Sequence, residues 1–279
     1  MKKTRTMLTA LVVSAFMMCC ALVAQGSANR TYVSSTGSDG NSVSDCQQTA
    51  PCRTFQTAIG QTNAGGQVIA LDSTGYSGFS VNKSITIQGA PGQIAFIFVG
   101  AGFSGITVTG VSTDLVVLRN IYVDGLGGGS TTGLTFTGAA RLIVENCTFK
   151  SSTTGISVSG TGGSKAKMDL INSDVNGNTT GISASGQGTD RSPSGNAAST
   201  TMVRINGGNI IGNGTAFFQT NPGVSLSNIL LLQVANAGNA SLTNIMGNTT
   251  VGLQSGTGTG CPAGVCTFPL LYFGMENIP

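Results

Sequence analysis

Thr131-Thr132-Gly133-Leu134 is a short sequence that the chain repeats twice, as Thr153-Thr154-Gly155-Ile156 and Thr179-Thr180-Gly181-Ile182. The first two glycines are 22 residues apart (133 to 155) and the next two are 26 apart (155 to 181). A fixed sequence that returns at such intervals is typical of a solenoid, in which each repeat contributes one coil.

The differences in repeat length fall in one loop. The step from residue 138 to residue 142 is four positions long, whereas the equivalent step from residue 160 to residue 168 is eight. The following step, 178–213, is 35 residues long, and its surplus lies within 186–203, which is the same loop one coil further on. The core unit therefore stays near 22 residues, and one corner of each coil varies.

The composition of the unit predicts β structure. A unit of this length, rich in Val, Ile, Thr and Gly, is too short for a helical hairpin and suits one coil of a parallel β-helix. We expect strands at 155–159 and 167–172, followed by a short strand near Val175. Alternation places Leu170 and Asn172 in the interior.

Stacked coils predict ladders of equivalent side chains about 4.8 Å apart. Two predicted ladders are apolar: Leu118, Val144, Leu170 and Ile205, and Val123, Phe149, Val175 and Ile210. A third consists of Asn120, Asn146 and Asn172 at a bend, where amides can bond one another and the turn backbone, each bond netting roughly 0.5–1.5 kcal/mol. We interpret these asparagines as structural.

The N-terminus reads as a secretory signal peptide. Basic residues within 1–5 precede an apolar run from Leu8 to Ala24, and small residues follow. Methionines at 17–18 stand where a lipobox needs small residues, which favours secretion over lipidation at Cys19 or Cys20. We expect a periplasmic or extracellular location.

Cleavage near residue 28 would leave a neutral chain. It removes three basic residues, so Lys+Arg falls from 13 to 10 and equals the 10 of Asp+Glu. A neutral chain does not indicate a nucleic-acid partner. The mature sequence also has no predicted transmembrane segment.

Five of the seven cysteines remain after cleavage. Cys46 and Cys52 form one short-range pair and Cys261 and Cys266 another, and we expect both to be disulfides in an oxidising compartment. Zinc is the alternative reading, but the chain has no histidine and the pairs are separated by five and four residues rather than two. Cys147 is interpreted as a structural thiol.

Several N-terminal segments resemble a known family. They are Thr31-Tyr-Val-Ser-Ser-Thr-Gly-Ser-Asp39, Cys46, Pro51-Cys-Arg-Thr-Phe55, Gly65-Gly66, Gly75-Tyr76 and Lys83-Ser-Ile-Thr-Ile87. Together they look like the opening of secreted bacterial right-handed parallel β-helix repeat proteins, of the pectate-lyase-like superfamily, over roughly residues 30–255. The resemblance implies a right-handed coil but no particular activity, since that superfamily mixes lyases, hydrolases, esterases and adhesins.

The predicted fold is therefore all-β, a right-handed parallel β-helix with a short N-terminal capping helix. Phe55 and Ile59 have the helical spacing that such a cap requires. We expect four segments: a signal peptide (1–28), an N-terminal cap (29–66), the parallel β-helix (67–255) and a C-terminal loop with a closing tail (256–279).

Catalysis on sugars needs clustered carboxylates, and the predicted register does not align them. Glu145 aligns with Arg119, while Asp169 aligns with Ile143 and Arg204, which predicts ion pairs between neighbouring coils. No two acids share a column on adjacent coils. The absence of histidine excludes a Ser-His-Asp triad.

Asp124 is a candidate binding residue that is either a turn residue or a calcium ligand. It precedes Gly125, and Asp-Gly is a common turn pair, which favours the turn. The glycines that follow lack the Lys-Ser/Thr of a phosphate loop. We expect no cofactor and no metal, and calcium enters only if the protein is a lyase.

The variable corner is the expected binding surface. Loops 161–166, 187–199 and 221–224 should stack into one wall, with charged residues on or beside it: Lys165, Lys167, Asp190 and Arg191. The alternative is that these loops vary because nothing constrains them. We predict a non-catalytic extracellular or envelope-associated protein that binds polysaccharide or a cell-surface component. The alternative function is a polysaccharide lyase or glycoside hydrolase, which the family permits.

Overall fold

The computed structural model describes residues 28–127, 129–138, 141–160, 166–186, 201–220, 230–235, 244–246 and 250–255. The predicted signal peptide up to residue 27, both C-terminal cysteines (Cys261 and Cys266) and three predicted binding residues (Lys165, Asp190 and Arg191) lie outside these ranges. The same holds for most of the variable corner.

The described chain is all-β apart from two short helices, η1 (Asp39–Ser44) and α2 (Phe55–Gln61). Its strands are β1 (Ala28–Val33), β2 (Thr62–Ala70), β3 (Gly75–Tyr76), β4 (Phe79–Val81), β5 (Ile85–Gly89), β6 (Ala95–Phe98), β7 (Ser104–Gly110), β8 (Leu115–Arg119), β9 (Ile121–Asp124), β10 (Thr132–Gly138), β11 (Arg141–Glu145), β12 (Thr148–Lys150), β13 (Thr154–Gly160), β14 (Ala166–Asn176), β15 (Thr180–Gly186), β16 (Thr201–Ile211), β17 (Thr215–Thr220), β18 (Leu230–Ala235), β19 (Asn244–Met246) and β20 (Thr250–Ser255).

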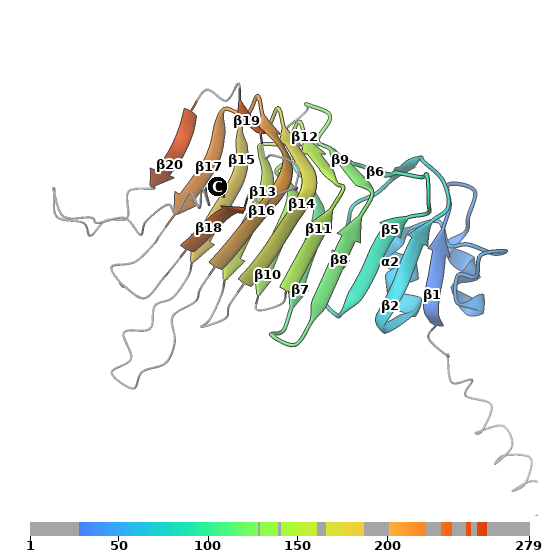
Figure 1. Cartoon of the computed structure of the whole chain (residues 1–279). Coiled ribbons are helices and arrows are strands. Elements are labelled where there is room, and N and C mark those ends of the chain that lie inside the picture. Colours follow the sequence, from blue (N-terminus) through green and yellow to red (C-terminus); the bar gives the residue numbers. More distant parts are fainter. Residues whose placement is uncertain are drawn as a thin grey trace, which may run out of the picture.

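These strands form two long parallel sheets (Figure 1). The larger sheet has two arms, joined by the long strands β14 and β16: arm 1 contains β1, β2, β5, β8, β11 and β18, and arm 2 contains β3, β6, β9, β12 and β19. The smaller sheet, called sheet B, has the order β20-β17-β15-β13-β10-β7-β4. From β2 onward the chain visits arm 1, arm 2 and sheet B in turn, an order consistent with a β-helix-like solenoid.

The two predicted apolar ladders are confirmed. Their residues pair in register across parallel strands, and all are fully buried: Leu118, Val144, Leu170 and Ile205 in arm 1, and Val123, Phe149, Val175 and Ile210 in arm 2. The strands expected at 167–172 and near Val175 are one continuous strand, β14. Like side chains thus stack on like along the core.

The predicted asparagine ladder lies at the bend between the arms, but its prediction was wrong in one respect. Asn120, Asn146 and Asn172 have φ values of 53°, 53° and 45°, in the left-handed region that Asn tolerates. Asn172 is exposed, not interior, because a left-handed residue interrupts the in-out alternation of a strand. Gly207, one strand further on, has a φ of 74°.

A different polar ladder is buried, directly before each copy of the repeated sequence and at the equivalent site in the next unit. Its members are Ser130, Ser152, Asn178 and Asn213, all at most 5% exposed. Backbone nitrogens of this turn donate to the asparagine side chains, as in the bond from Ser152 N to Asn178 Oδ1 (3.0 Å). The asparagines of this ladder therefore satisfy turn backbone inside the core.

The predicted capping helix is present as α2. Thr54 is its N-cap and accepts a hydrogen bond from the Thr57 backbone at 3.3 Å. The helix buries Phe55, whose ring centre lies 4.9 Å from that of Tyr76 and 4.8 Å from that of Phe79. It packs against β1, β2 and β4, and so covers the first strands of the stack.

The predicted Cys46–Cys52 disulfide is also confirmed, and both residues are fully buried. Backbone hydrogen bonds run from Tyr32 N to Cys46 O (2.8 Å) and from Cys52 N to Tyr32 O (2.9 Å). The disulfide thus holds the segment that contains η1 against β1.

Candidate functional site

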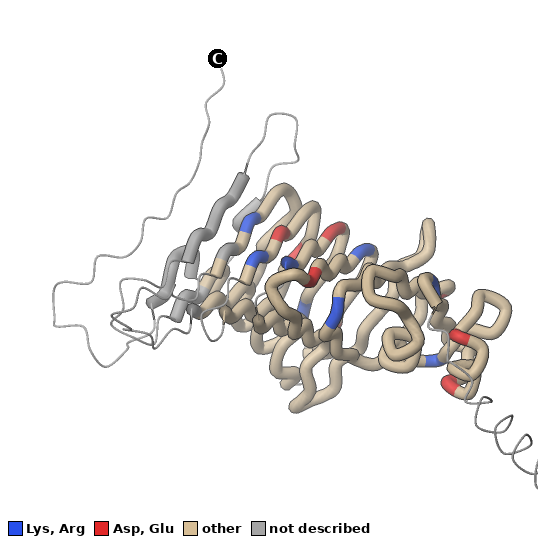
Figure 2. The backbone as a smooth tube through the Cα atoms, turned by 90° about the horizontal axis from the view of Figure 1, so that it is seen from below, with Lys and Arg blue, Asp and Glu red and all other residues tan. Residues whose placement is uncertain are grey.

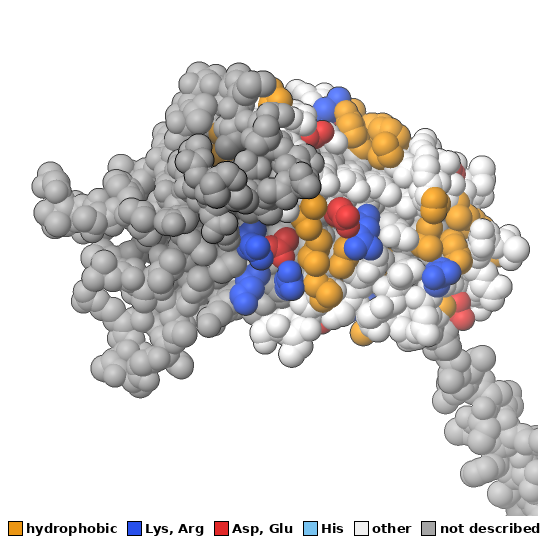
Figure 3. All heavy atoms as spheres, in the orientation of Figure 1, with side chains coloured by type: hydrophobic (Ala, Val, Ile, Leu, Met, Phe, Trp, Pro, Cys, Tyr) orange, Lys and Arg blue, Asp and Glu red, His pale blue; other side chains and the backbone are white. Residues whose placement is uncertain are grey.

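The outer face of arm 1 carries rows of charged side chains, because β8, β11, β14 and β16 pair in register. The rows are Leu115–Arg141–Lys167, Val117–Ile143–Asp169–Arg204 and Arg119–Glu145–Ile171. Figure 2 shows basic and acidic residues interspersed on neighbouring strands, and Figure 3 shows charged side chains on both sides of a hydrophobic band. The face is therefore regular in spacing and mixed in character.

Both predicted ion pairs are confirmed on this face. Arg119 Nε lies 2.6 Å from Glu145 Oε2, and Arg204 Nη1 lies 3.6 Å from Asp169 Oδ1. Asp169 has a second partner that the alignment missed, since Arg141 donates to Oδ2 from Nη2 (2.8 Å) and from Nε (3.1 Å). The guanidinium groups are about half exposed, so each pair contributes roughly 0.2–1 kcal/mol.

We call Arg141, Lys167, Arg204 and Asp169 the basic cluster. It holds three positive charges and one negative charge, a net of +2, on three adjacent strands. Lys167 lies directly opposite Arg141 and is exposed, and within the described ranges it makes no ion pair. This is where the structure places Lys167, the one predicted corner residue that it describes.

Asp124 lies apart from this cluster, on arm 2. Its Oδ1 accepts a hydrogen bond from Leu126 N (2.8 Å), and its Oδ2 lies 3.1 Å from Lys150 Nζ. The hydrogen bonds that the Lys150 ammonium makes with Tyr122 and Asp124 stabilise its charged form and raise its pKa. Asp124 thus has the contacts of a turn residue, the interpretation that its sequence favours.

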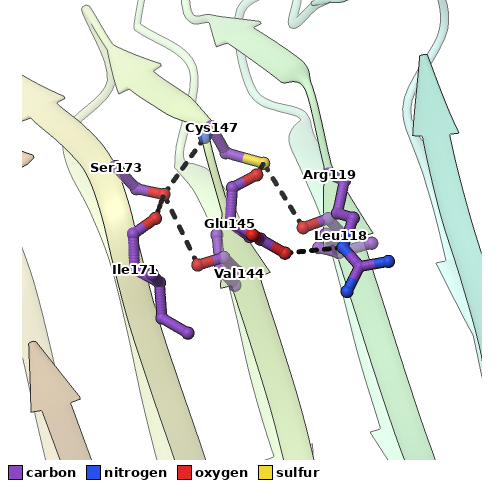
Figure 4. A network of polar contacts seen from close by, with 7 residues as sticks. All are labelled: Leu118, Arg119, Val144, Glu145, Cys147, Ile171 and Ser173. Atoms are coloured by element: carbon purple, nitrogen blue, oxygen red, sulfur yellow. Dashed lines mark hydrogen bonds and ion pairs between the residues drawn. The ribbon is translucent and has the colours of Figure 1, made fainter. Parts of the chain in front are cut away.

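A polar network occupies the bend behind the charged face (Figure 4). The Cys147 thiol lies 3.6 Å from Leu118 O and 3.3 Å from Glu145 O, and burial raises its pKa to about 12. One strand further on, Ser173 Oγ donates to Ile171 O (2.8 Å) and accepts from Cys147 N (3.1 Å). Cys147 is therefore a packed structural group.

Asp72 is a polar centre that sequence reasoning missed. Its Oδ2 accepts hydrogen bonds from Ser34 Oγ (3.0 Å), Ser35 N (2.8 Å) and Ser35 Oγ (2.7 Å), and its Oδ1 accepts from the Tyr76 hydroxyl. Burial raises the pKa of Asp72, but these donors outweigh burial and hold it below its usual value. The carboxylate is saturated by donors of the protein itself, which indicates a structural role.

Neither a metal site nor a membrane-spanning helix is present in the described part of the chain. It contains no group of three Asp, Glu, Cys or His side chains placed to hold a metal ion. Nor do those residues include a helix with the length and apolar character needed to cross a membrane.

Comparison of the chain with protein-family models, with curated proteins and with solved structures found no match. Support for a function therefore comes from the residues described above, the basic cluster first among them.

Proposed function

We propose that the protein is a secreted, right-handed parallel β-helix of the pectate-lyase-like kind, with a non-catalytic extracellular or envelope-associated role. In this proposal it binds acidic polysaccharide through the basic cluster. The observation that carries the proposal is the group of three exposed cations, Arg141, Lys167 and Arg204, around the single carboxylate of Asp169. A polyanion can contact several such cations at once, and the net positive charge of the cluster attracts it from a distance.

Two features support the secreted fold. The N-terminal sequence has the pattern of a signal peptide, and the Cys46–Cys52 disulfide is typical of oxidising compartments. Successive strands of the chain lie in arm 1, arm 2 and sheet B in a repeating order, which supports a helical coil of β-strands.

The contacts of the carboxylates favour binding over catalysis. Glu145 and Asp169 are diagonal neighbours on the outer face, since Ile143 lies opposite Asp169 and Glu145 follows two residues later. A glycoside hydrolase needs two carboxyl groups that are available to the glycosidic bond. Here each carboxylate is held by an arginine, Glu145 by Arg119 and Asp169 by Arg141.

Binding of polygalacturonate by the mature protein, measured by calorimetry at low and high salt, tests the proposal. We expect binding that salt weakens. Lys167→Gln should lower the affinity roughly two- to fivefold, whereas Asp169→Asn should raise it, because one change removes a positive charge and the other a negative charge. Lys150→Gln, on arm 2, is the matched control and should have no effect.

Neutral dextran serves as the ligand control. Equal effects of Lys167→Gln and Lys150→Gln, or binding that does not respond to salt, would contradict the proposal. Release of unsaturated or reducing-end products from polygalacturonate would instead favour the lyase or hydrolase alternative.

A further inference from the structure

A hollow of about 430 Å³ lies at the N-terminal edge of sheet B, on strands that do not carry the basic cluster. It is bounded by α2, β4, the loop after β6 and the start of β7. The side chains that matter here are Gln56, Ser80, Phe98, Phe103 and Thr107. None of the described residues that line the hollow is charged. Its chemistry therefore suits an uncharged ligand.

Two phenylalanine rings stand exposed at this hollow. Phe103 is 71% exposed and Phe98 is 45% exposed. The Phe98 ring is held in place, since it lies so close over Gly75 that a Cβ there would be 2.6 Å from the ring. The backbone of Phe103 is also fixed, because Thr131 donates to its carbonyl from N (3.0 Å) and Oγ1 (3.1 Å). The Phe98 ring, together with the uncovered Phe103 ring on its held backbone, offers a platform for the apolar face of a sugar ring.

Polar groups stand beside the rings. Gln56 Oε1 accepts a hydrogen bond from Ser80 N (2.9 Å), which orients the amide, and its Nε2 has no partner among the described residues. Ser80 and Thr107 lie opposite each other on β4 and β7. Their hydroxyls likewise have no partner in the described ranges. Such groups both donate and accept, as the hydroxyls of a sugar do.

The same polar character continues along the outer face of sheet B. Residues that pair across neighbouring strands place hydroxyl side chains in two rows. The first row is Ser80, Thr107, Thr135, Ser157 and Ser183, and the second is Thr109, Thr137, Ser159 and Ser185. Successive positions within a row lie on neighbouring strands, which are about 4.8 Å apart. The described strands β7, β10, β13 and β15 contain no charged residue. An uncharged, hydroxylated track thus begins at the hollow.

We infer that the hollow and these two hydroxyl rows form a second binding site, which takes a neutral, extended glycan chain lying across the strands of sheet B. The rings of Phe98 and Phe103 stack on one sugar, and the rows hydrogen-bond to the sugars that follow. This site is independent of the acidic ligand proposed above, because it uses another face and no charge.

The test is calorimetric titration of the mature protein with tri- and hexasaccharides of β-1,4-linked glucan, mannan and xylan. We expect at least one hexasaccharide to bind, and to bind more tightly than its trisaccharide. Phe103→Ala should weaken binding roughly tenfold through loss of stacking. Val111→Ala, which truncates another exposed apolar side chain (64% exposed), is the matched control and should change nothing.

Two further variants separate the parts of the site. Gly100 lines the hollow, and a Cβ added there meets only the Phe103 ring, at an ordinary contact distance of 3.7 Å. Gly100→Leu should therefore fit without backbone strain and block the hollow. Ser157→Ala should weaken the hexasaccharide but not the trisaccharide. Lys167→Gln should leave neutral glycans unaffected, which distinguishes this site from the basic cluster. The inference is overturned if none of the neutral glycans binds, or if Phe103→Ala and Val111→Ala behave alike.

Discussion

Asn178 and Asn213 hydrogen-bond to each other inside the core, with Asn178 Nδ2 donating to Asn213 Oδ1 at 3.0 Å. Each amide nitrogen also donates to a backbone carbonyl, that of Phe149 (3.2 Å) from Asn178 and that of Val175 (2.8 Å) from Asn213. The Asn178 backbone nitrogen in turn donates to Asn213 Oδ1 (3.0 Å). Both side chains therefore satisfy backbone groups that water does not reach.

Truncation of Asn178 should for this reason be costly. Asn178→Ala leaves the Ser152 backbone nitrogen and the Phe149 carbonyl without their partner, so we expect a loss of about 1–3 kcal/mol. Asn178→Ser should cost less, because Ser152 occupies the equivalent place naturally. Urea denaturation followed by circular dichroism measures both, and equal losses for Ala and Ser would contradict the role given to the side chain.

The left-handed backbone at the bend between the arms leads to a second prediction. Asn146 has a φ of 53°, and the equivalent residue two strands further on is Gly207, with a φ of 74°. Asn146→Gly should therefore be tolerated, whereas Asn146→Val should lose about 1–2 kcal/mol to backbone strain. The melting temperatures of the two variants test this. A Val variant as stable as the Gly variant would show that the left-handed conformation is not required.

The carboxylate of Asp72 predicts acid sensitivity. Burial raises its pKa, but hydrogen bonds from Tyr76, Ser35 and Ser34 hold it below the usual 3.8. A lowered pKa in the folded state contributes stability that is present above pH 3.8 and lost as the pH falls through the folded-state value. Asp72→Asn should thus lower the urea midpoint at neutral pH, and its difference from the parent should shrink in acid. A difference that does not depend on pH would argue against this account.

The cysteines can be counted by alkylation without reductant. Cys147 is 2% exposed and burial raises its pKa to about 12, so the folded protein should not be labelled there at pH 8. After unfolding, the mature chain should show a single reactive thiol if Cys261 and Cys266 form the second predicted disulfide. Labelling of Cys147 in the folded state would contradict the packing at the bend, and additional thiols after unfolding would contradict the second disulfide.

The sequence was sufficient to predict the register of the core. In a parallel stack, position within the repeat decides which residues meet, and Leu170 does lie between Val144 and Ile205. The alignment of equivalent residues did not predict contacts between diagonal neighbours on adjacent strands. Arg141 reaches Asp169 although it lies opposite Lys167, because long side chains span neighbouring positions.

Other features depend on backbone conformation and tertiary packing. Alternation placed Asn172 inside, but a left-handed residue breaks alternation, and the only sign of it in the sequence is the recurrence of Asn at this position. The buried pair Asn178 and Asn213 did carry a signal, since Asn178 directly precedes Thr179-Thr180-Gly181 and a second Asn stands at the equivalent place, before Gly214-Thr215. The hollow carried none, because it requires α2 to dock and Phe98 to lie over Gly75.

Strand β10 pairs with β7 on one side and with β13 on the other through the same residue positions, so the chain could lose or gain a whole coil at this point. Thr132 lies between Ser104 and Thr154, and Leu134 between Ile106 and Ile156. Removal of residues 132–153, which is 22 residues, would bring β7 directly beside β13 and join side chains of the same kind. Whole units could thus be gained or lost during evolution without new packing. Each change would lengthen or shorten the hydroxyl rows, and with them the glycan site that we infer on sheet B.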